Sequence, residues 1–183
     1  MTDRLRLTPL DPTPGSGDVE AVHAWVVEDR AQFWMMRDHT LDEVRDIYRW
    51  ITDQPTHAAY LVREGDERRG LFQTYDPRAE EIGEHYEVRD GDVGIHLMLA
   101  PAVEVRPGFT WDVAALVGDA VFGDPGVHRL VVEPDARNAK AVGRAQALGF
   151  TMEKVVELST KPASLGFLTR DVYESVFSKN SSA

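Results

Sequence analysis

The sequence predicts a single-domain α/β fold built on a mixed sheet. The 183 residues are enough for one domain with its own core, and none of them is a cysteine that could form a disulfide. In the second half of the chain, strand-like segments alternate with helical segments, which requires some parallel pairing. Two further strand-like segments on either side of a charged turn indicate a hairpin and add antiparallel pairing.

The first third of the chain is expected to form one strand and two helices. The strand covers about residues 4–9, and a helix runs from Asp18 to Glu28. Thr40 and Glu43 match a capping box, in which a hydroxyl and a carboxylate bind the free amides at a helix start. The residues that follow carry an apolar stripe at helical spacing, which comprises Val44, Ile47, Tyr48 and Ile51.

Three strands follow these helices. His57–Val62 and Gly70–Tyr75 form the hairpin, with Glu64–Arg69 as its turn. Asp92–Ala100 is mostly apolar, which is typical of a central strand.

The remaining elements complete the alternation. A loop at Pro101–Gly108 precedes a helix from about Thr110 to Phe122. A strand at His128–Glu133 leads into a helix from about Asn138 to Leu148, which Gly149 ends. Strands around 151–159 and 164–169, a short amphipathic segment over 171–177 and a disordered tail over 178–183 are expected last.

Charge and hydropathy exclude several classes of protein. The formal net charge of −11 argues against a nucleic-acid partner, because binding phosphates requires a basic face. There is no apolar run long enough for a signal peptide or a membrane span, which predicts a cytoplasmic protein with no membrane partner.

Two polar residues at strand positions are candidates for chemistry. His96 lies in the middle of an apolar strand, and on its own this position favours a core histidine bonded to the backbone. Asp135 follows a strand end, where an aspartate commonly caps the next helix. An imidazole changes its protonation near neutral pH, so that a histidine at an open site can accept a proton from a nucleophile.

Several short motifs resemble those of the GNAT superfamily of acyl-CoA N-acyltransferases. Asn138-Ala-Lys-Ala141 followed by Gly149-Phe150 looks like the superfamily's Asn-x-x-Ala…Gly-Phe helix. A narrower set resembles the siderophore-biosynthesis branch, the aerobactin-type and mycobactin-type acyltransferases. That set comprises Phe33-Trp-Met-Met36, Gly94-Ile-His-Leu-Met98, Val132-Glu-Pro-Asp-Ala-Arg-Asn138 and Leu165-Gly-Phe-Leu-Thr-Arg170.

The resemblance implies a mostly antiparallel sheet whose two central strands separate to admit the acyl-pantetheine of acyl-CoA. It also implies that the helix after the loop points its amino end at the pyrophosphate, which suits an acidic protein. The loop departs from the superfamily pattern, because Val105–Thr110 holds one glycine and a proline that cannot donate. The expected acyl-CoA ligands are Met98, Leu99, Ala100, Arg106, Gly108, Phe109, Thr110 and Asn138.

The same resemblance makes His96 and Asp135 the expected catalytic pair, with a backbone amide near Met98–Ala100 as the oxyanion donor. Many GNAT enzymes have a tyrosine four residues before the glycine of the Gly-Phe pair, as general acid for the thiolate, and here that residue is Ala145. With no cysteine to form an acyl-enzyme, direct attack in a ternary complex is expected.

The acceptor pocket of this family is built where the chain carries aromatic and methionine residues. Such stripes more often belong to a core. The best candidates for pocket residues are His23, Trp34, Gln73 and Tyr75. The histidines show no ligand-like spacing to carboxylates, so no metal site is expected.

The leading hypothesis is transfer of an acyl group from acetyl-CoA or succinyl-CoA to the hydroxylamine nitrogen of an N-hydroxylated lysine, ornithine or cadaverine. The product would be a hydroxamate for siderophore biosynthesis. An aminoglycoside or general amine N-acetyltransferase is the first alternative, and a non-catalytic acyl-CoA-binding module is the second. The protein is expected to be a monomer or a homodimer.

Overall fold

The chain is described here from a computed structural model, which places residues 5–102, 104 and 106–178. It divides into two compact units, each built from two segments of the chain. The first unit joins Met1–Thr74 to His96–Val113, and the second joins Tyr75–Ile95 to Ala114–Ala183. A single domain therefore stays a prediction.

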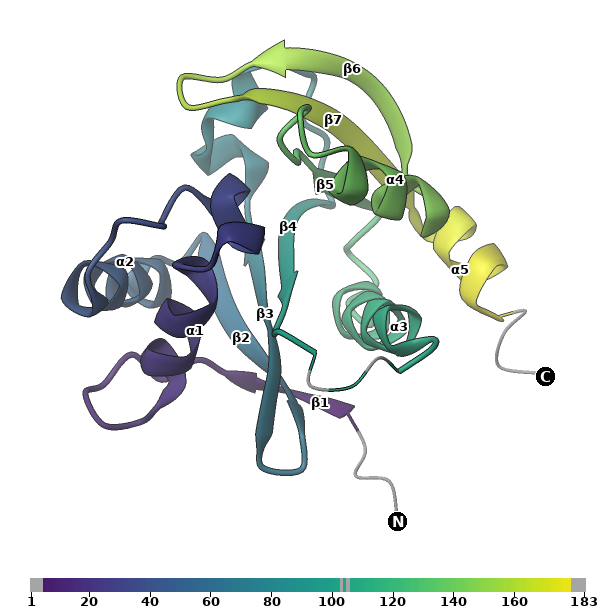
Figure 1. Ribbon diagram of the computed structural model, residues 1–183. Helices are drawn as coiled ribbons and strands as arrows, with labels where there is room; N and C mark the ends of the chain where they lie inside the picture. Colours follow the sequence, from purple (N-terminus) through teal and green to yellow (C-terminus); the bar gives the residue numbers. More distant parts are fainter. Residues whose placement is uncertain (1–4, 103, 105, 179–183) are drawn as a thin grey trace. The chain divides into compact units, whose positions relative to one another are not determined.

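The strands form a seven-stranded mixed sheet, as the sequence predicts, and β4 contributes to both units (Figure 1). In the first unit the order is β1-β2-β3-β4, and in the second it is β4-β5-β7-β6. The strands are β1 (Leu5–Pro9), β2 (His57–Glu64), β3 (Glu67–Tyr75), β4 (Asp92–Leu99), β5 (Arg129–Val132), β6 (Thr151–Glu157) and β7 (Pro162–Thr169).

One pair of strands in the second unit is parallel, β4 with β5, whereas β5–β7 and β6–β7 are antiparallel. The parallel pairing begins at Asp92–Arg129 and ends at Gly94–Val131. The sheet is therefore mostly antiparallel, with a short parallel contact at its centre.

The hairpin of β2 and β3 is longer than the sequence indicates. The two strands extend to Glu64 and Glu67, so that only Gly65 and Asp66 remain as the turn, and the prediction of a six-residue turn was wrong. Gly65 has a φ of 58°, which tight hairpin turns require and which glycine adopts without strain. As a result, charged side chains that were assigned to a turn lie on the ends of strands.

Helices α1 (Asp18–Val26) and α2 (Leu41–Asp53) pack against one face of β2 and β3 (Figure 1). Their shared core holds Val19, Val22, Val44 and Tyr48, which recur at helical spacing and are fully buried. The predicted capping box is confirmed, since Thr40 and Glu43 each bind the other's backbone amide. A short 3₁₀ helix that the sequence did not reveal, η1 (Asp29–Trp34), lies between α1 and α2.

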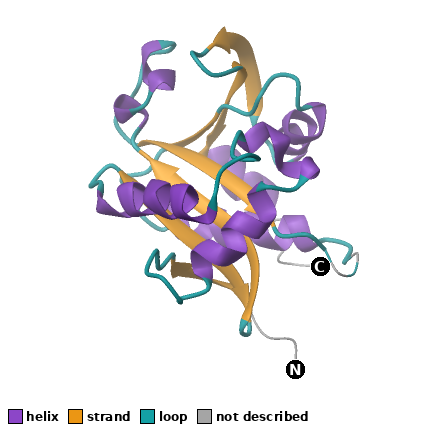
Figure 2. Cartoon of the chain, turned by 60° about the vertical axis from the view of Figure 1, so that its left-hand side comes forward, coloured by secondary structure: helices purple, strands orange, loops and turns teal. Residues whose placement is uncertain are grey.

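Helix α3 (Phe109–Phe122) begins in the first unit, and the helices not yet described belong to the second. These are η2 (Pro77–Ala79), η3 (Glu81–Glu84), α4 (Ala139–Ala147) and α5 (Arg170–Ser178). Figure 2 distinguishes all helices, in purple, from the strands, in orange. The ring of Tyr173 on α5 occupies the space that a side chain at Gly118 on α3 would fill, so the two helices pack closely at this point. Ser178 ends α5 rather than beginning the tail, and residues 179–183 lie outside the described residues.

Candidate functional site

His96 lies half-buried on β4, in the first unit of the chain. The indole of Trp34 meets its imidazole edge to face, with the ring centroids 6.2 Å apart and the planes at 73°. Trp34 is the last residue of η1, which Met35 ends in the left-handed conformation at a φ of 56°. Two of the residues proposed from the sequence, one catalytic and one from the acceptor pocket, are therefore in contact.

A second contact ties η1 to β4. The guanidinium of Arg30 donates from Nη1 to the backbone oxygen of Leu99 at 2.9 Å, and its Nε pairs with Glu28 at 2.5 Å. η1 is thus fixed to the second half of β4 at both of its ends. This explains why an irregular segment holds a defined position over the strand.

The peptides at the end of β4 point in alternate directions. The amide of Ala100 donates to the oxygen of Arg69 at 2.9 Å, and the oxygen of Met98 lies 2.7 Å from where a side chain at Gly70 would begin. Both groups therefore face β3. In a trans peptide the N–H points opposite to the C=O, so the amide of Leu99 faces away from β3. Among Met98, Leu99 and Ala100, the residues expected to supply the oxyanion donor, Leu99 is therefore the one whose amide points away from β3.

The start of α3 gathers the residues that the sequence assigned to the phosphates of acyl-CoA. Gly108 has a φ of 82°, and its oxygen accepts from Asp112 at 2.9 Å. The amide of Phe109 is already used, because it donates to the oxygen of Arg106 at 3.2 Å. No backbone acceptor among the described residues is recorded for the amides of Gly108 and Thr110, which are the candidates for anion binding in this turn.

Arginine side chains add positive charge to the same turn. Both Arg106 and Arg69 stack on the ring of Phe109, with the guanidinium carbons 4.4 and 5.0 Å from the ring centroid. Arg69 was missed in the sequence, because its position depends on the hairpin register of β2 and β3. Two guanidinium groups, the candidate amides of this turn and the Leu99 amide are all donors, which suits a phosphorylated pantetheine ligand.

Two other residues expected in the acceptor pocket belong to the first unit. His23 donates from Nε2 to the backbone oxygen of His39 at 3.0 Å, which ties α1 to the segment before α2. Gln73 is buried on β3, with 7% of its surface exposed. The contact of His23 favours a structural role for that residue, whereas Trp34 lies against the candidate base.

In the second unit, Tyr75 belongs to a buried polar network. Its hydroxyl donates to Oε1 of Glu133 at 3.3 Å, and Nζ of Lys161 lies 2.5 Å from Oε2 of the same carboxylate. Burial raises the pKa of Tyr75 well above its usual value, and the Glu133 charge raises the pKa further. The phenol is therefore neutral, and the carboxylate is compensated by a lysine of the chain itself.

Asp135 is held by its neighbour Arg137. Its carboxylate accepts from Nε, Nη2 and the backbone amide of Arg137 at 2.9, 2.6 and 2.9 Å, and only 1% of the side chain is exposed. The hydrogen bonds from Arg137 lower the pKa of this carboxyl group. The residue that caps α4 is Asn138, whose side chain accepts from Ala141 at 3.1 Å, so the alternative of Asp135 as the helix cap was wrong.

The two residues of the expected catalytic pair belong to different units, His96 to the first and Asp135 to the second. Their pairing stays a prediction. Their surroundings nevertheless differ. The imidazole of His96 lies against the ring of Trp34, whereas the carboxylate of Asp135 is bound to Arg137.

Over the described ranges, no three histidine, aspartate or glutamate side chains gather as a metal site would require. Within the same ranges, no helix is long and apolar enough to cross a membrane.

Comparison with known proteins assigns the chain to a family. Residues 15–158 match the acetyltransferase (GNAT) domain. The chain is 26% identical over 149 residues to a hydroxyornithine transacylase of Ajellomyces capsulatus, a match that covers 80% of this chain and 34% of the relative. The chain thus spans about a third of that relative's length.

Other relatives match over nearly their whole length. An aminoglycoside N(6')-acetyltransferase type 1 of Klebsiella pneumoniae is 24% identical over 187 residues, which covers 93% of each protein. Among solved structures, an uncharacterized protein from Bacillus halodurans has a TM-score of 0.87 at 22% identity, with 96% of this chain and 89% of that chain covered.

The structure of AAC(6')-Ib in complex with ribostamycin and coenzyme A has a TM-score of 0.81 at 22% identity, with 96% of this chain and 98% of that chain covered. These structural likenesses confirm the predicted fold. The matched domain covers most of the sequence and includes η1, β4 and the start of α3. The chain belongs to the GNAT acetyltransferase family.

Proposed function

We propose that the chain transfers an acyl group from acyl-CoA to the hydroxylamine nitrogen of an N-hydroxylated lysine, ornithine or cadaverine. The product is a hydroxamate that serves siderophore biosynthesis in the cytoplasm. The hydroxyornithine transacylase among the relatives supports this acceptor class.

The observation that carries the choice of acceptor is the state of the two carboxylates after β5. Glu133 is bound by Lys161, and Asp135 is bound by Arg137. An aminoglycoside carries several ammonium groups, and it would need carboxylates that are free to pair with them. A hydroxylamine is largely neutral at physiological pH. The reacting nitrogen of such an acceptor therefore needs no free carboxylate as a partner.

His96 is the proposed general base. The acceptor nitrogen attacks the thioester carbon, a nitrogen–carbon bond forms, and the nitrogen's proton passes to the imidazole of His96. The amide of Leu99 donates to the developing oxyanion. The carbon–sulfur bond then breaks, and the thiolate leaves with the electron pair and is protonated by water, since Ala145 has no proton to give.

The remaining residues position these groups. Trp34 fixes the imidazole plane and forms one wall for the acceptor, with Gln73 and Tyr75 as further candidates. Arg106, Gly108 and Thr110 bind the phosphates, while Asn138 lies toward the pantetheine arm. Asp135 acts through the loop that it shapes with Arg137 rather than by moving a proton.

An aminoglycoside N-acetyltransferase is the second candidate, because such an enzyme matches 93% of this chain and 93% of its own length. The two candidates differ in the acceptor, so the test is a matrix of acetyl-CoA and succinyl-CoA against N6-hydroxylysine, lysine, N-hydroxycadaverine and kanamycin. Products are identified by mass spectrometry. We expect acylation of the hydroxylated nitrogen, and a product from kanamycin alone would overturn the proposal.

A matched pair of variants tests the base. His96→Ala removes the imidazole, whereas His23→Ala removes one that is bound to the backbone of His39. Loss of a general base costs about 10²-fold in kcat/KM or more, and we expect that loss for His96→Ala only. An equal effect of both substitutions would contradict the assignment.

A further inference from the structure

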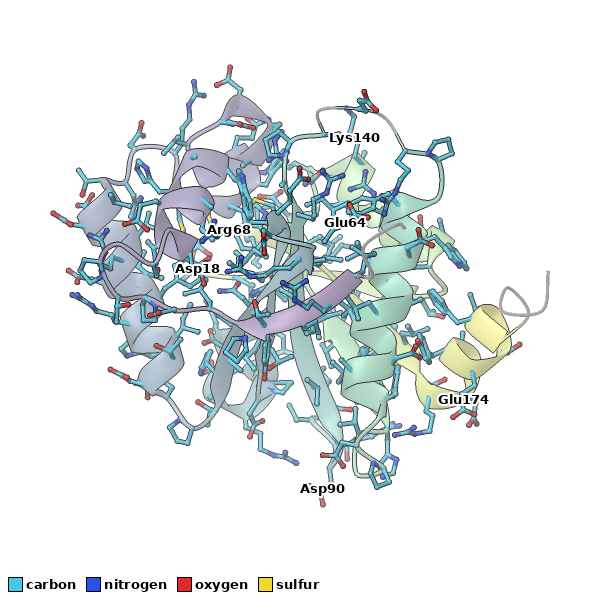
Figure 3. The ribbon with its side chains drawn as sticks, turned by 90° about the horizontal axis from the view of Figure 1, so that it is seen from below. Asp18, Glu64, Arg68, Asp90, Lys140 and Glu174 are labelled. Atoms are coloured by element: carbon cyan, nitrogen blue, oxygen red, sulfur yellow. The ribbon has the colours of Figure 1, made fainter. Side chains whose placement is uncertain are left out.

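A carboxylate from β2 lies against the turn at the start of α3, which is the proposed phosphate-binding turn. Glu64, the last residue of β2 and labelled in Figure 3, lies 2.5 Å from Nη1 of Arg106 through Oε1. Its other oxygen lies 3.5 Å from Nε of Arg69. The Glu64 side chain is 16% exposed, so a single half-buried carboxylate serves both arginines.

The ring of Phe109 holds these arginines in place by contacts that do not depend on Glu64. Both guanidinium groups stack on that ring, and such contacts keep their planes oriented when a partner anion is exchanged. Glu64, Arg69, Arg106 and Phe109 all belong to the first unit of the chain.

The charges of this cluster suit an exchange of anions. Arg69 and Arg106 share Glu64, and Arg69 also pairs with the exposed Glu67 at 3.1 Å. Both guanidinium groups lie on Phe109 at the amino end of α3, where an anion is favoured. A phosphate group offers more charge and more acceptor oxygens than a carboxylate, and it binds guanidinium groups in the same planar geometry. Acyl-CoA brings several such groups to the chain.

We propose that Glu64 is an internal counter-ion that occupies Arg106 and Arg69 in the ligand-free protein and gives them up to the phosphates of acyl-CoA. Arg69 is then a second phosphate-binding arginine beside Arg106. The inference rests on the proposed use of acyl-CoA and adds two residues to its binding. It predicts that the carboxylate at Glu64 opposes binding of the cofactor.

The experiment measures the dissociation constant of coenzyme A by calorimetry for the full chain and three variants. Glu64→Gln removes the competing charge and keeps the shape of the side chain. Glu67→Gln is the matched control, because Glu67 pairs with Arg69 at 3.1 Å, is 72% exposed and has no ion pair with Arg106 among the described residues. Arg69→Gln removes the second arginine. Melting temperatures of all four proteins report any loss of folding.

We expect Glu64→Gln to bind coenzyme A about threefold tighter or more, and Arg69→Gln about threefold weaker or more, while Glu67→Gln stays within about twofold of the parent. If Glu64 instead orients the arginines for the ligand, Glu64→Gln binds more weakly, and the proposal is wrong. Unchanged binding in Glu64→Gln also overturns it. Failure of the unsubstituted chain to bind coenzyme A would contradict the proposed function itself and is distinguishable from both.

Discussion

The ring of Tyr75 lies directly against the backbone of Gly94. A Cβ at position 94 would stand 2.1 Å from the ring's Cζ, far inside any contact distance. Gly94 is therefore required by packing, two residues before His96 on the same strand. The glycine of the Gly-x-His motif on β4 thus has a steric cause.

Substitution of Gly94 by alanine should destabilise the fold. The clash forces the ring of Tyr75 off its position, and we expect a loss of about 2 kcal/mol or more in the free energy of unfolding, measured in urea. Gly143→Ala is the control, since no described atom lies within 4 Å of its Cβ and it occupies the interior of α4. That variant should gain about 0.5–1 kcal/mol. Equal effects of the two substitutions on the free energy of unfolding would show that the ring of Tyr75 moves aside without cost, which would contradict this account.

The ion pair of Lys161 with Glu133 predicts a second effect on stability. The two side chains are 14% and 8% exposed, so Lys161→Met removes the cation from a buried carboxylate. We expect a loss of about 3 kcal/mol in the free energy of unfolding, measured by urea titration. Adding Glu133→Gln should restore part of that loss, because it removes the buried charge. A double variant no more stable than Lys161→Met would contradict this account.

The carboxylate of Asp135 should contribute to stability in a pH-dependent way. Its pKa is lowered in the folded protein by the hydrogen bonds from Arg137. The contribution is therefore fully present above about pH 4, where an unfolded aspartate ionises, and it is lost as the pH falls through the lower folded pKa. We expect Asp135→Asn to be less stable than the parent at pH 7, and the difference to close below about pH 4. A difference that is constant in urea titrations from pH 7 to pH 3 would contradict this role.

The contact of Trp34 with His96 predicts an effect on catalysis. Edge-to-face aromatic pairs contribute about 0.5–1.5 kcal/mol, so Trp34→Ala should lower kcat/KM for the acceptor by about two- to tenfold. Trp34→Phe keeps a ring at this place and should retain most of the activity. The readout is steady-state kinetics with the acceptor varied at saturating acyl-CoA. A loss that is as large in Trp34→Phe would show that shape, rather than ring contact, is what matters.

Local patterns predicted the elements of this fold well. The Thr40–Glu43 capping box, the alternation of strands and helices in the second half and Gly149 after α4 are all signals carried by neighbouring residues. The 3₁₀ helix η1 carries no such signal, because one or two turns show no hydrophobic period. The position of η1 over β4 depends on Arg30 and Trp34. Their partners, Leu99 and His96, lie on β4 and are distant in the sequence.

The sequence predicted which residues belong to the candidate site better than it predicted the contacts that these residues make. Glu64 and Arg106 lie 42 residues apart in the sequence, and Tyr75 and Glu133 lie 58 apart. No local rule fixes contacts at that separation, since they depend on the register of the sheet. The bonds from Arg137 to Asp135 join residues that are close in sequence, and they were not predicted for a different reason. The sequence favours a catalytic role for this carboxylate and offers a helix cap as the alternative.

The most direct test of the proposed function compares one acceptor with and without its hydroxyl group. The measurement is kcat/KM for N6-hydroxylysine and for lysine with the same acyl-CoA at neutral pH. Because the hydroxylamine nitrogen is neutral and the lysine nitrogen is protonated, we expect a preference of about 10²-fold or more for N6-hydroxylysine. Equal rates with the two acceptors, or a preference for lysine, would contradict the proposal that this chain forms hydroxamates.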